Sequence, residues 1–183
     1  MKLVVLDRDG VINQDSKTYI KSVDEWLPID GSIDAIASLS NAGYSVVIAT
    51  NQSGLGRKLF DEYALAQIHH NLCSMVEEAG GMIDGIFYCP HIPEDRCQCR
   101  KPGVGLLRQI EQEFACSLAG SYFVGDSYRD IQAALRFDCN PVLVKTGNGI
   151  ETEKVLKCEG LDSVPVFADL AEAVRQLLAN DNA

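Results

Sequence analysis

Four short groups of charged and polar residues hold the side chains that could carry chemistry in this sequence. The first group is residues 7–10, Asp-Arg-Asp-Gly. Two carboxylates two positions apart can take different roles, one attacking a substrate or binding a metal ion while the other transfers a proton. Because the same residues also suit an ordinary turn, this group alone favours neither interpretation.

The second and third groups offer contacts to an anion. Residues 50–54, Thr-Asn-Gln-Ser-Gly, combine a hydroxyl, two amides and a glycine-freed backbone that can cradle phosphate oxygens. Arg100 and Lys101 precede Pro102, a residue suited to the first turn of a helix, so we expect two cations at a helix amino end. A polar loop and a solvated basic pair are the structural alternatives.

The fourth group, residues 125–130, contains two carboxylates four positions apart. If a helix begins here, Asp126 and Asp130 share one face of it. Together with Asp7 they would form an all-oxygen site suited to Mg²⁺. The structural alternative is that Asp126 caps the helix and Asp130 lies in its first turn.

A cysteine-rich segment, residues 89–99, is the candidate for a second metal site. Its candidate ligands are Cys89, His91, Cys97 and Cys99. Three thiols and one imidazole match the tetrahedral set of structural Zn²⁺, and they leave no open position for catalysis. The alternative is a loop that is cysteine-rich by chance, which a reducing compartment disfavours. Because the segment leads into Arg100 and Lys101, bound zinc would fix both cations.

The remaining cysteines and the helical histidines are expected to be structural. Cys73, Cys116, Cys139 and Cys158 lack such neighbours and are predicted to be buried or half-buried thiols. His69 and His70 fall on a predicted helix away from the four groups, so we expect no chemistry from them.

The hydrophobic pattern predicts strands and helices in alternation. Residues 2–6, 45–50, 83–89, 121–124 and 141–144 are expected as strands, and residues 33–39, 65–79, 107–114 and 168–178 as helices. Alternation predicts an α/β fold, a parallel sheet with helices on both faces. Ligand sites in such sheets lie beyond the carboxyl ends of the strands, where the four groups fall. We expect one domain over residues 1–183.

The composition excludes several classes of protein. The chain has 183 residues, 46% hydrophobic and 23% charged, as in folded globular proteins. Its formal net charge of −10 disfavours binding to nucleic acid. No apolar run is long enough to span a bilayer, and Asp7 interrupts the first one, so we expect no membrane partner and a cytoplasmic location. We also expect a monomer.

The ordered set of four groups closely resembles the haloacid dehalogenase (HAD) superfamily of phosphotransferases over residues 3–144. The resemblance implies a Rossmann-like sheet, with Asp7 as the nucleophile that becomes an aspartyl phosphate. It implies that Asp9 protonates the leaving oxygen and later activates water, and that Thr50 and Lys101 hold the phosphoryl group. It also implies magnesium bound by Asp7, the backbone carbonyl of Asp9 and Asp126, with Asp130 in support.

Members of this superfamily select substrates largely with an inserted cap domain, and this sequence has no room for one. Residues 10–49 fit a turn region and one helix, and residues 51–100 fit one helix, one strand and the zinc loop. A capless fold with a zinc loop resembles two subfamilies, the phosphatases of heptose 1,7-bisphosphate and of histidinol phosphate. The sequence of residues 50–57 is similar to the heptose group, which acts in the ADP-heptose route to lipopolysaccharide core. Histidinol phosphate is the alternative substrate.

The resemblance leaves short loops to recognise the substrate. The candidates for substrate contact are Asp15, Tyr19, Asn51, Gln52, Ser53, Arg57, Arg100 and Ser127. A sugar bisphosphate carries a second phosphate that extra cations would bind, and Lys17, Arg57 and Arg100 are available. Ser127 lies where many relatives have a basic residue.

An alternative of another class is a non-catalytic, zinc-bearing interaction module whose acidic cluster only binds a cation. The feature that distinguishes the two classes is Asp9 together with Lys101, which binding alone would not require. Magnesium-dependent release of phosphate from an aryl phosphate would identify the enzyme.

Overall fold

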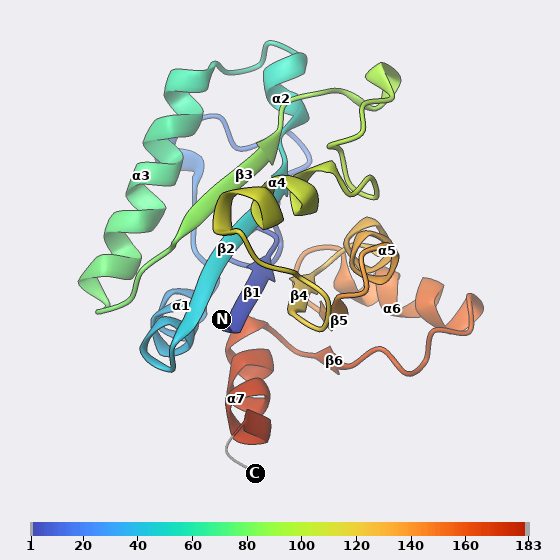
Figure 1. The fold of residues 1–183 in the computed structure, drawn as a ribbon. Helices are drawn as coiled ribbons and strands as arrows, with labels where there is room; N and C mark the ends of the chain where they lie inside the picture. The colour runs from blue at the N-terminus through green and yellow to red at the C-terminus, as the bar shows by residue number, and fades with distance from the viewer. Residues whose placement is uncertain (1, 182–183) are drawn as a thin grey trace.

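The computed structural model describes residues 2–181 and contains a six-stranded parallel sheet (Figure 1). The strands are β1 (Lys2–Leu6), β2 (Tyr44–Asn51), β3 (Gly85–Cys89), β4 (Tyr122–Gly125), β5 (Asn140–Val144) and β6 (Val166–Phe167). Their order across the sheet is β3-β2-β1-β4-β5-β6. All neighbouring strands run parallel, which confirms the predicted fold class.

Helices cover both faces of the sheet (Figure 1). They are α1 (Ser32–Asn41), α2 (Ser53–Gly56), α3 (Glu62–Glu78), α4 (Gly105–Phe114), α5 (Tyr128–Arg136), α6 (Gly149–Cys158) and α7 (Leu170–Asp181), with single 3-10 turns at Val23–Glu25 and Pro93–Asp95. One core cluster joins the sheet to α1, α3 and α7. A second joins its other face to α4 and α5. A third, smaller cluster packs α6 against α5 and β5.

The central strand β1 shows why the fold follows from the sequence. Val4 and Leu6 pack into the first cluster, whereas Leu3 and Val5 pack into the second. Successive side chains of a strand point to opposite faces, so a strand covered on both faces must be apolar throughout. The apolar run 3–6 meets that requirement.

The strand order reverses direction at β1, which pairs with β2 on one side and β4 on the other. The chain winds one way from β1 to β3 and the other way from β4 to β6. This switch point leaves a crevice at the carboxyl ends of β1 and β4, where α/β sheets bind ligands. Asp7 follows β1 and Asp126 follows β4, so both carboxylates lie at this crevice.

The connections between strands agree with the predicted absence of a cap. Within residues 2–181, the segment from β1 to β2 holds one 3-10 turn and α1, and the segment from β2 to β3 holds α2 and α3. No helix of the described chain has the length and apolar character needed to cross a bilayer.

Several boundaries differ from the sequence prediction. The sequence patterns missed α6 and β6, because β6 has only two residues and α6 buries only three of its ten. Pro102 does not lie in the first turn of a helix, since α4 begins at Gly105. Instead, a turn in which the N–H of Gly103 donates to the carbonyl of Arg100 (2.7 Å) precedes that helix.

Candidate active site

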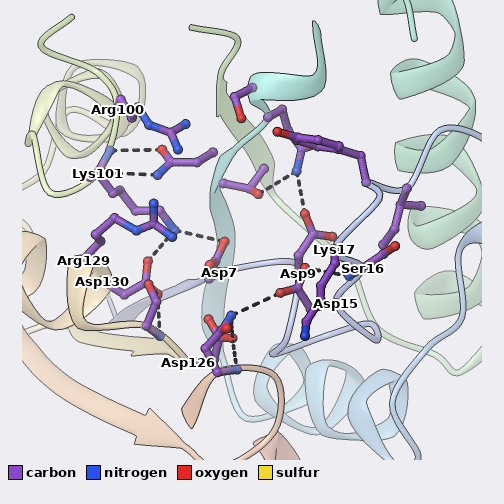
Figure 2. A pocket seen from close by; sticks show the side chains of 18 residues that line it. Asp7, Asp9, Asp15, Ser16, Lys17, Arg100, Lys101, Asp126, Arg129 and Asp130 are labelled. Carbon is purple, nitrogen blue, oxygen red and sulfur yellow. Dashed lines mark hydrogen bonds and ion pairs between the residues drawn. The ribbon is translucent and has the colours of Figure 1, made fainter. Parts of the chain in front are cut away.

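A cavity of about 310 Å³ opens at the carboxyl ends of β1, β2 and β4 (Figure 2). Every residue predicted for catalysis, magnesium or substrate contact lines it, with the exception of Arg57. The side chains come from loops that are distant in sequence. The parallel sheet brings them together because its strands all end at this edge.

Asp7 is almost completely buried at the end of β1. Its backbone N–H donates to the carbonyl of Val124 (2.9 Å), which ties the loop to β4. Its Oδ1 accepts a hydrogen bond from the N–H of Arg8 (2.7 Å) and lies 2.9 Å from Nζ of Lys101. Burial raises the pKa of Asp7 to about 8, with the nearby carboxylates adding to the effect and Lys101 opposing it.

Lys101 is 2% exposed, and its ammonium is surrounded by oxygen atoms. Besides Asp7, Nζ lies 2.6 Å from Oδ1 of Asp130 and donates to the carbonyl of Ala49 (2.7 Å). Burial alone would lower the pKa of Lys101, but Asp130 and Asp7 outweigh it and raise that pKa. Lys101 therefore stays charged in the site.

The backbone of Lys101 is fixed by Asn51 at the end of β2. Oδ1 of Asn51 accepts from the N–H of Lys101 (3.0 Å), and Nδ2 donates to the carbonyl of Lys101 (3.2 Å). Both Oδ1 and Nδ2 of Asn51 are thus bonded to the backbone of Lys101. Asn51, a predicted substrate contact that also lines the cavity, therefore positions Lys101. The expected placement of the two cations at a helix amino end is wrong, because α4 begins four residues after Lys101 and the Asn51 contact holds the loop instead.

Asp9 is held by three side chains that donate to it. Arg8 contacts both oxygens at 2.9 to 3.1 Å, Nδ2 of Asn13 lies 2.9 Å from Oδ1, and Nε2 of Gln52 lies 2.8 Å from Oδ2. Burial would raise the pKa of Asp9, but these donors outweigh it and lower that pKa. Gln52 also donates to Oγ1 of Thr50 (2.9 Å) and so links the predicted phosphate-binding hydroxyl to Asp9.

Three buried carboxylates, those of Asp7, Asp126 and Asp130, can place one oxygen each within 4.8 Å of one another. Burial, with Asp130 adding to it, raises the pKa of Asp126 to about 6. The one ammonium of Lys101 leaves this cluster with excess negative charge, which a divalent cation would neutralise. Hard carboxylate oxygens are the ligands that Mg²⁺ prefers, so the cluster fits that ion.

Asp126 and Asp130 do not share a helix face as expected, because α5 begins at Tyr128 and Asp126 lies in the loop before it. Oδ2 of Asp130 accepts from the N–H (3.0 Å) and the hydroxyl (2.6 Å) of Ser127, which caps the helix. Asp126 instead accepts from the backbone and side-chain N–H groups of Asn148 at 2.7 and 3.0 Å. The two carboxylates still converge, through the loop and not through helical spacing.

The four predicted zinc ligands come together beside the cavity. Among their Sγ and Nδ1 atoms, five pairs lie 3.2 to 3.6 Å apart. A tetrahedral zinc with bonds of about 2.3 Å to sulfur requires sulfur atoms about 3.8 Å apart, close to this spacing. The set fits Zn²⁺. Its loop also holds Arg100, whose N–H donates to Sγ of Cys97 (3.4 Å) and whose Nη1 donates to the carbonyl of His91 (3.3 Å).

Arg57 is absent from the cavity lining, contrary to its predicted role. It follows the four-residue helix α2, and its Nη2 lies 4.0 Å from Oε2 of Glu94 on the outside of the zinc loop. The short helix turns the chain away from the cavity, and periodicity in the sequence gave no sign of this helix.

The structure adds site residues that sequence reasoning missed. Arg129 and Asn148 line the cavity, and Nδ2 of Asn148 also donates to Oδ2 of Asp15 (3.1 Å). Many relatives have a basic residue at the position of Ser127. Arg129 lies only two residues further along the chain, so its proximity in sequence was a signal that could have identified it. Asn148 belongs to none of the four groups, and its position shortly after β5, at the carboxyl edge of the sheet, was the one signal that could have marked it.

His69 is the clearest correction to the sequence analysis. The expectation that it lies away from the motifs is wrong, since its Nε2 lies 3.2 Å from Nη1 of Arg8. Residues of α3 and β1 belong to the same core cluster, and the packing that brings His69 to Arg8 cannot be read from the helix's own sequence.

Known proteins resemble this chain both in sequence and in fold. The HAD-hydrolase-like family model matches residues 98–173. A curated D-glycero-beta-D-manno-heptose-1,7-bisphosphate 7-phosphatase of Pseudomonas aeruginosa is 51% identical over 96% of this chain and 97% of its own length. The chain belongs to this phosphatase family of the HAD superfamily.

Other relatives agree with this assignment. The curated phosphatase of the same name from Bordetella bronchiseptica is 50% identical over 97% of this chain. A crystal structure of D,D-heptose 1,7-bisphosphate phosphatase from B. bronchiseptica, complexed with magnesium and phosphate, has a TM-score of 0.93 at 50% identity, covering 98% of this chain and 99% of its own. The heptose-bisphosphate phosphatase from Burkholderia thailandensis is more distant, with a TM-score of 0.74 at 40% identity.

Proposed function

We propose that this chain is a single-domain, magnesium-dependent phosphatase that removes the 7-phosphate of D-glycero-D-manno-heptose 1,7-bisphosphate and leaves the 1-phosphate. The observation that carries the proposal is the contact of Lys101 with Asp7, beside a second, separately held carboxylate, Asp9. A module that only binds a cation would need neither Lys101 nor Asp9. The relatives that are about half identical to this chain carry this activity in their names.

Asp7 is the proposed nucleophile. One of its carboxylate oxygens bonds to phosphorus while the bond from phosphorus to the sugar oxygen breaks, and that oxygen takes a proton from Asp9. Water then attacks phosphorus and gives a proton to Asp9, so that inorganic phosphate leaves and the Asp7 carboxylate is restored. Lys101 and Thr50 hold the phosphoryl oxygens, where the ammonium offsets the negative charge that spreads over them.

Asp7, Asp126 and the backbone carbonyl of Asp9 are the proposed magnesium ligands, with Asp130 in support. When bound, Mg²⁺ supplies positive charge that reduces the repulsion between a carboxylate and a phosphate. Arg8 and its neighbours lower the pKa of Asp9, so its acid form must arise when substrate binds. A phosphate dianion beside Asp9 favours this, because a nearby negative charge raises the pKa of a carboxyl group.

Arg100 and Arg129 are the proposed contacts for the second phosphate. Both line the cavity (Figure 2), and among residues 2–181 neither forms an ion pair with a carboxylate. Burial lowers the pKa of Arg100, and the positive charge of Arg129 lowers it further, so the two guanidinium groups are close enough to repel. An anion between them would relieve that repulsion. Arg129 thus supplies the positive charge that many relatives carry at the position of Ser127. Lys17 is a further cation in the lining.

The same two arginines argue against histidinol phosphate. That substrate carries an ammonium group and a single phosphate, and an ammonium placed near Arg100 and Arg129 would be repelled. We expect kcat/KM to be highest for the heptose bisphosphate, lower for heptose 7-phosphate, and lowest for histidinol phosphate. A higher kcat/KM for histidinol phosphate than for either sugar phosphate would overturn the substrate assignment.

The covalent step has its own test. Acid quenching during turnover followed by borohydride reduction converts an aspartyl phosphate to homoserine, which mass spectrometry locates. We expect homoserine at position 7 in the wild type. The Asp7→Asn variant should show neither homoserine nor turnover. Turnover by the wild type without any homoserine would contradict Asp7 as the nucleophile.

The proposed setting is the cytoplasm, with the chain acting as a monomer. A reducing compartment keeps the four zinc ligands as thiols and imidazole available to the metal, and the shortest distance between their sulfur atoms, 3.2 Å, is far longer than a disulfide bond. Gel filtration with light scattering checks the monomer, and a mass of two chains would contradict it.

A further inference from the structure

Arg8 is a completely buried guanidinium at the edge of the site. A buried cation is tolerated only when it is paired and its donors are bonded. Three of its contacts go to the carboxylate of Asp9: Nε to Oδ1 at 3.0 Å, and Nη2 to Oδ1 and Oδ2 at 2.9 and 3.1 Å. Its fourth contact, from Nη1, leads away from the cavity to Nε2 of His69 (3.2 Å) on α3.

The chemistry of the pair fixes the state of His69. A guanidinium has donors and no acceptor, so Nε2 of His69 must present its lone pair and the ring proton must be on Nδ1. Burial and the charge of Arg8 lower the pKa of His69 to about 3, which keeps the ring neutral. The ring also packs against Tyr88 of β3, with centroids 6.0 Å apart and planes tilted by 58°. His69 therefore offers Arg8 an acceptor of fixed position.

We propose that His69 is a positioning residue for proton transfer, because it anchors Arg8 and Arg8 in turn orients the carboxylate of Asp9. This inference rests on the proposed function, in which Asp9 protonates the leaving oxygen. Asp7 is held separately, by Lys101 and by the backbone N–H of Arg8, so it does not depend on the imidazole. Loss of the His69 acceptor should disturb Asp9 and leave Asp7 in place.

A loss of proton donation by Asp9 can be distinguished from a loss of attack by Asp7, because only proton donation depends strongly on the leaving group. A sugar oxygen is a poor leaving group and needs the proton of Asp9, whereas 4-nitrophenolate leaves without protonation. The rate of attack by Asp7 alone can therefore be measured as the burst of 4-nitrophenolate. Single-turnover cleavage of the heptose bisphosphate measures attack together with proton donation.

The test compares three variants with the wild type. In His69→Leu the acceptor is lost, in His69→Gln an oxygen acceptor is kept, and His70→Leu is the control because His70 is exposed on the same helix. We expect His69→Leu to slow single-turnover cleavage of the bisphosphate by about tenfold or more, a part of what a general acid contributes. Its KM and nitrophenolate burst rate should stay within about twofold. His69→Gln should recover most of the rate, and His70→Leu should match the wild type.

Equal slowing of both substrates by His69→Leu, with melting temperatures unchanged, would overturn the proposal, as would no slowing of either. Nitrogen-15 NMR of the histidine rings in the wild-type protein gives a second readout that is independent of turnover. We expect the proton of His69 on Nδ1, and a proton on Nε2 would overturn the inference. Absence of turnover by the wild type would instead refute the proposed function, while the NMR result would still decide whether Nε2 accepts from Arg8.

Discussion

Nζ of Lys101 lies 2.9 Å from Oδ1 of Asp7, in a contact that joins the loop after the zinc ligands to the end of the central strand. The same ammonium contacts Asp130 at 2.6 Å and the carbonyl of Ala49 at 2.7 Å. One cation thus holds two carboxylates that would otherwise repel each other. In the proposed reaction it also stabilises the phosphoryl group, so its removal has consequences for both stability and rate.

Replacement of Lys101 by methionine should lower kcat/KM by about a hundredfold to a thousandfold, the loss typical for one preorganised charged contact to a transition state. The metal-free variant should also melt at a lower temperature, because its buried carboxylates lose their counter-charge. Steady-state kinetics and thermal unfolding measure both effects. Lys154→Met is the control, since among residues 2–181 Lys154 forms an ion pair only with Glu151, at the surface. A loss of less than tenfold would contradict the assigned role.

The metal-free protein should become less stable as pH rises from 6 to 8. The pKa of Asp7 is about 8 in the folded protein and near 3.8 when unfolded, so between these values the folded state holds a proton that the unfolded state has lost. Stability therefore falls with rising pH, by about 1 kcal/mol per pH unit for one such group. Denaturant unfolding without metal, at pH 6, 7 and 8, measures the slope.

Asp7→Asn removes this titrating group and should flatten the slope, so the variant should be more stable than the wild type at pH 8 without metal. Magnesium affinity of the wild type should increase over the same pH range, because the ion binds the deprotonated carboxylates. Parallel slopes for the two proteins would show that Asp7 does not carry the raised pKa.

Removal of zinc should weaken substrate binding more than magnesium binding. The zinc loop fixes Arg100 through Sγ of Cys97 and the carbonyl of His91. We expect Cys97→Ser, with zinc loss verified by metal analysis, to raise KM for the bisphosphate by about tenfold, equivalent to one charge-assisted hydrogen bond. Cys158→Ser is the control, because the Cys158 thiol is exposed and its prediction as a buried or half-buried thiol is wrong. An unchanged KM in zinc-free protein would show that the loop does not position Arg100.

Substitution of Arg129 and, as a comparison, of Arg57 tests how the second phosphate is bound. Arg129→Ser should raise KM for the bisphosphate by about tenfold or more, the loss of one charge-assisted contact, and leave 4-nitrophenyl phosphate unaffected. Arg57→Ser should change neither KM for the bisphosphate nor hydrolysis of 4-nitrophenyl phosphate, because the Arg57 guanidinium lies beside Glu94 and outside the cavity. If Arg57→Ser raises KM for the bisphosphate more than Arg129→Ser does, then Arg57 binds the second phosphate, as the sequence predicts, and Arg129 does not.

The sequence by itself determined the fold class and the position of the motifs along the chain. The apolar run 3–6 must be a strand buried on both faces, and a polar group directly after a buried strand must fall at the sheet edge, so Asp7 and Asp9 could be located without a structure. The zinc ligands could be located for a similar reason, since their short spacing confines them to one loop. These features depend on local pattern and on the geometry of parallel sheets.

Only the tertiary structure decided which distant side chains meet. The sequence predicts Lys101 at a helix amino end and Arg57 in the cavity. In the structure Asn51 holds Lys101, and Arg57 lies beside Glu94 outside the cavity. Arg129 and His69 drew no functional prediction, yet one lines the cavity and the other contacts Arg8. Such contacts depend on how helices and loops pack on the sheet. That packing is set by many weak contacts over the whole chain, so no single segment's sequence encodes it.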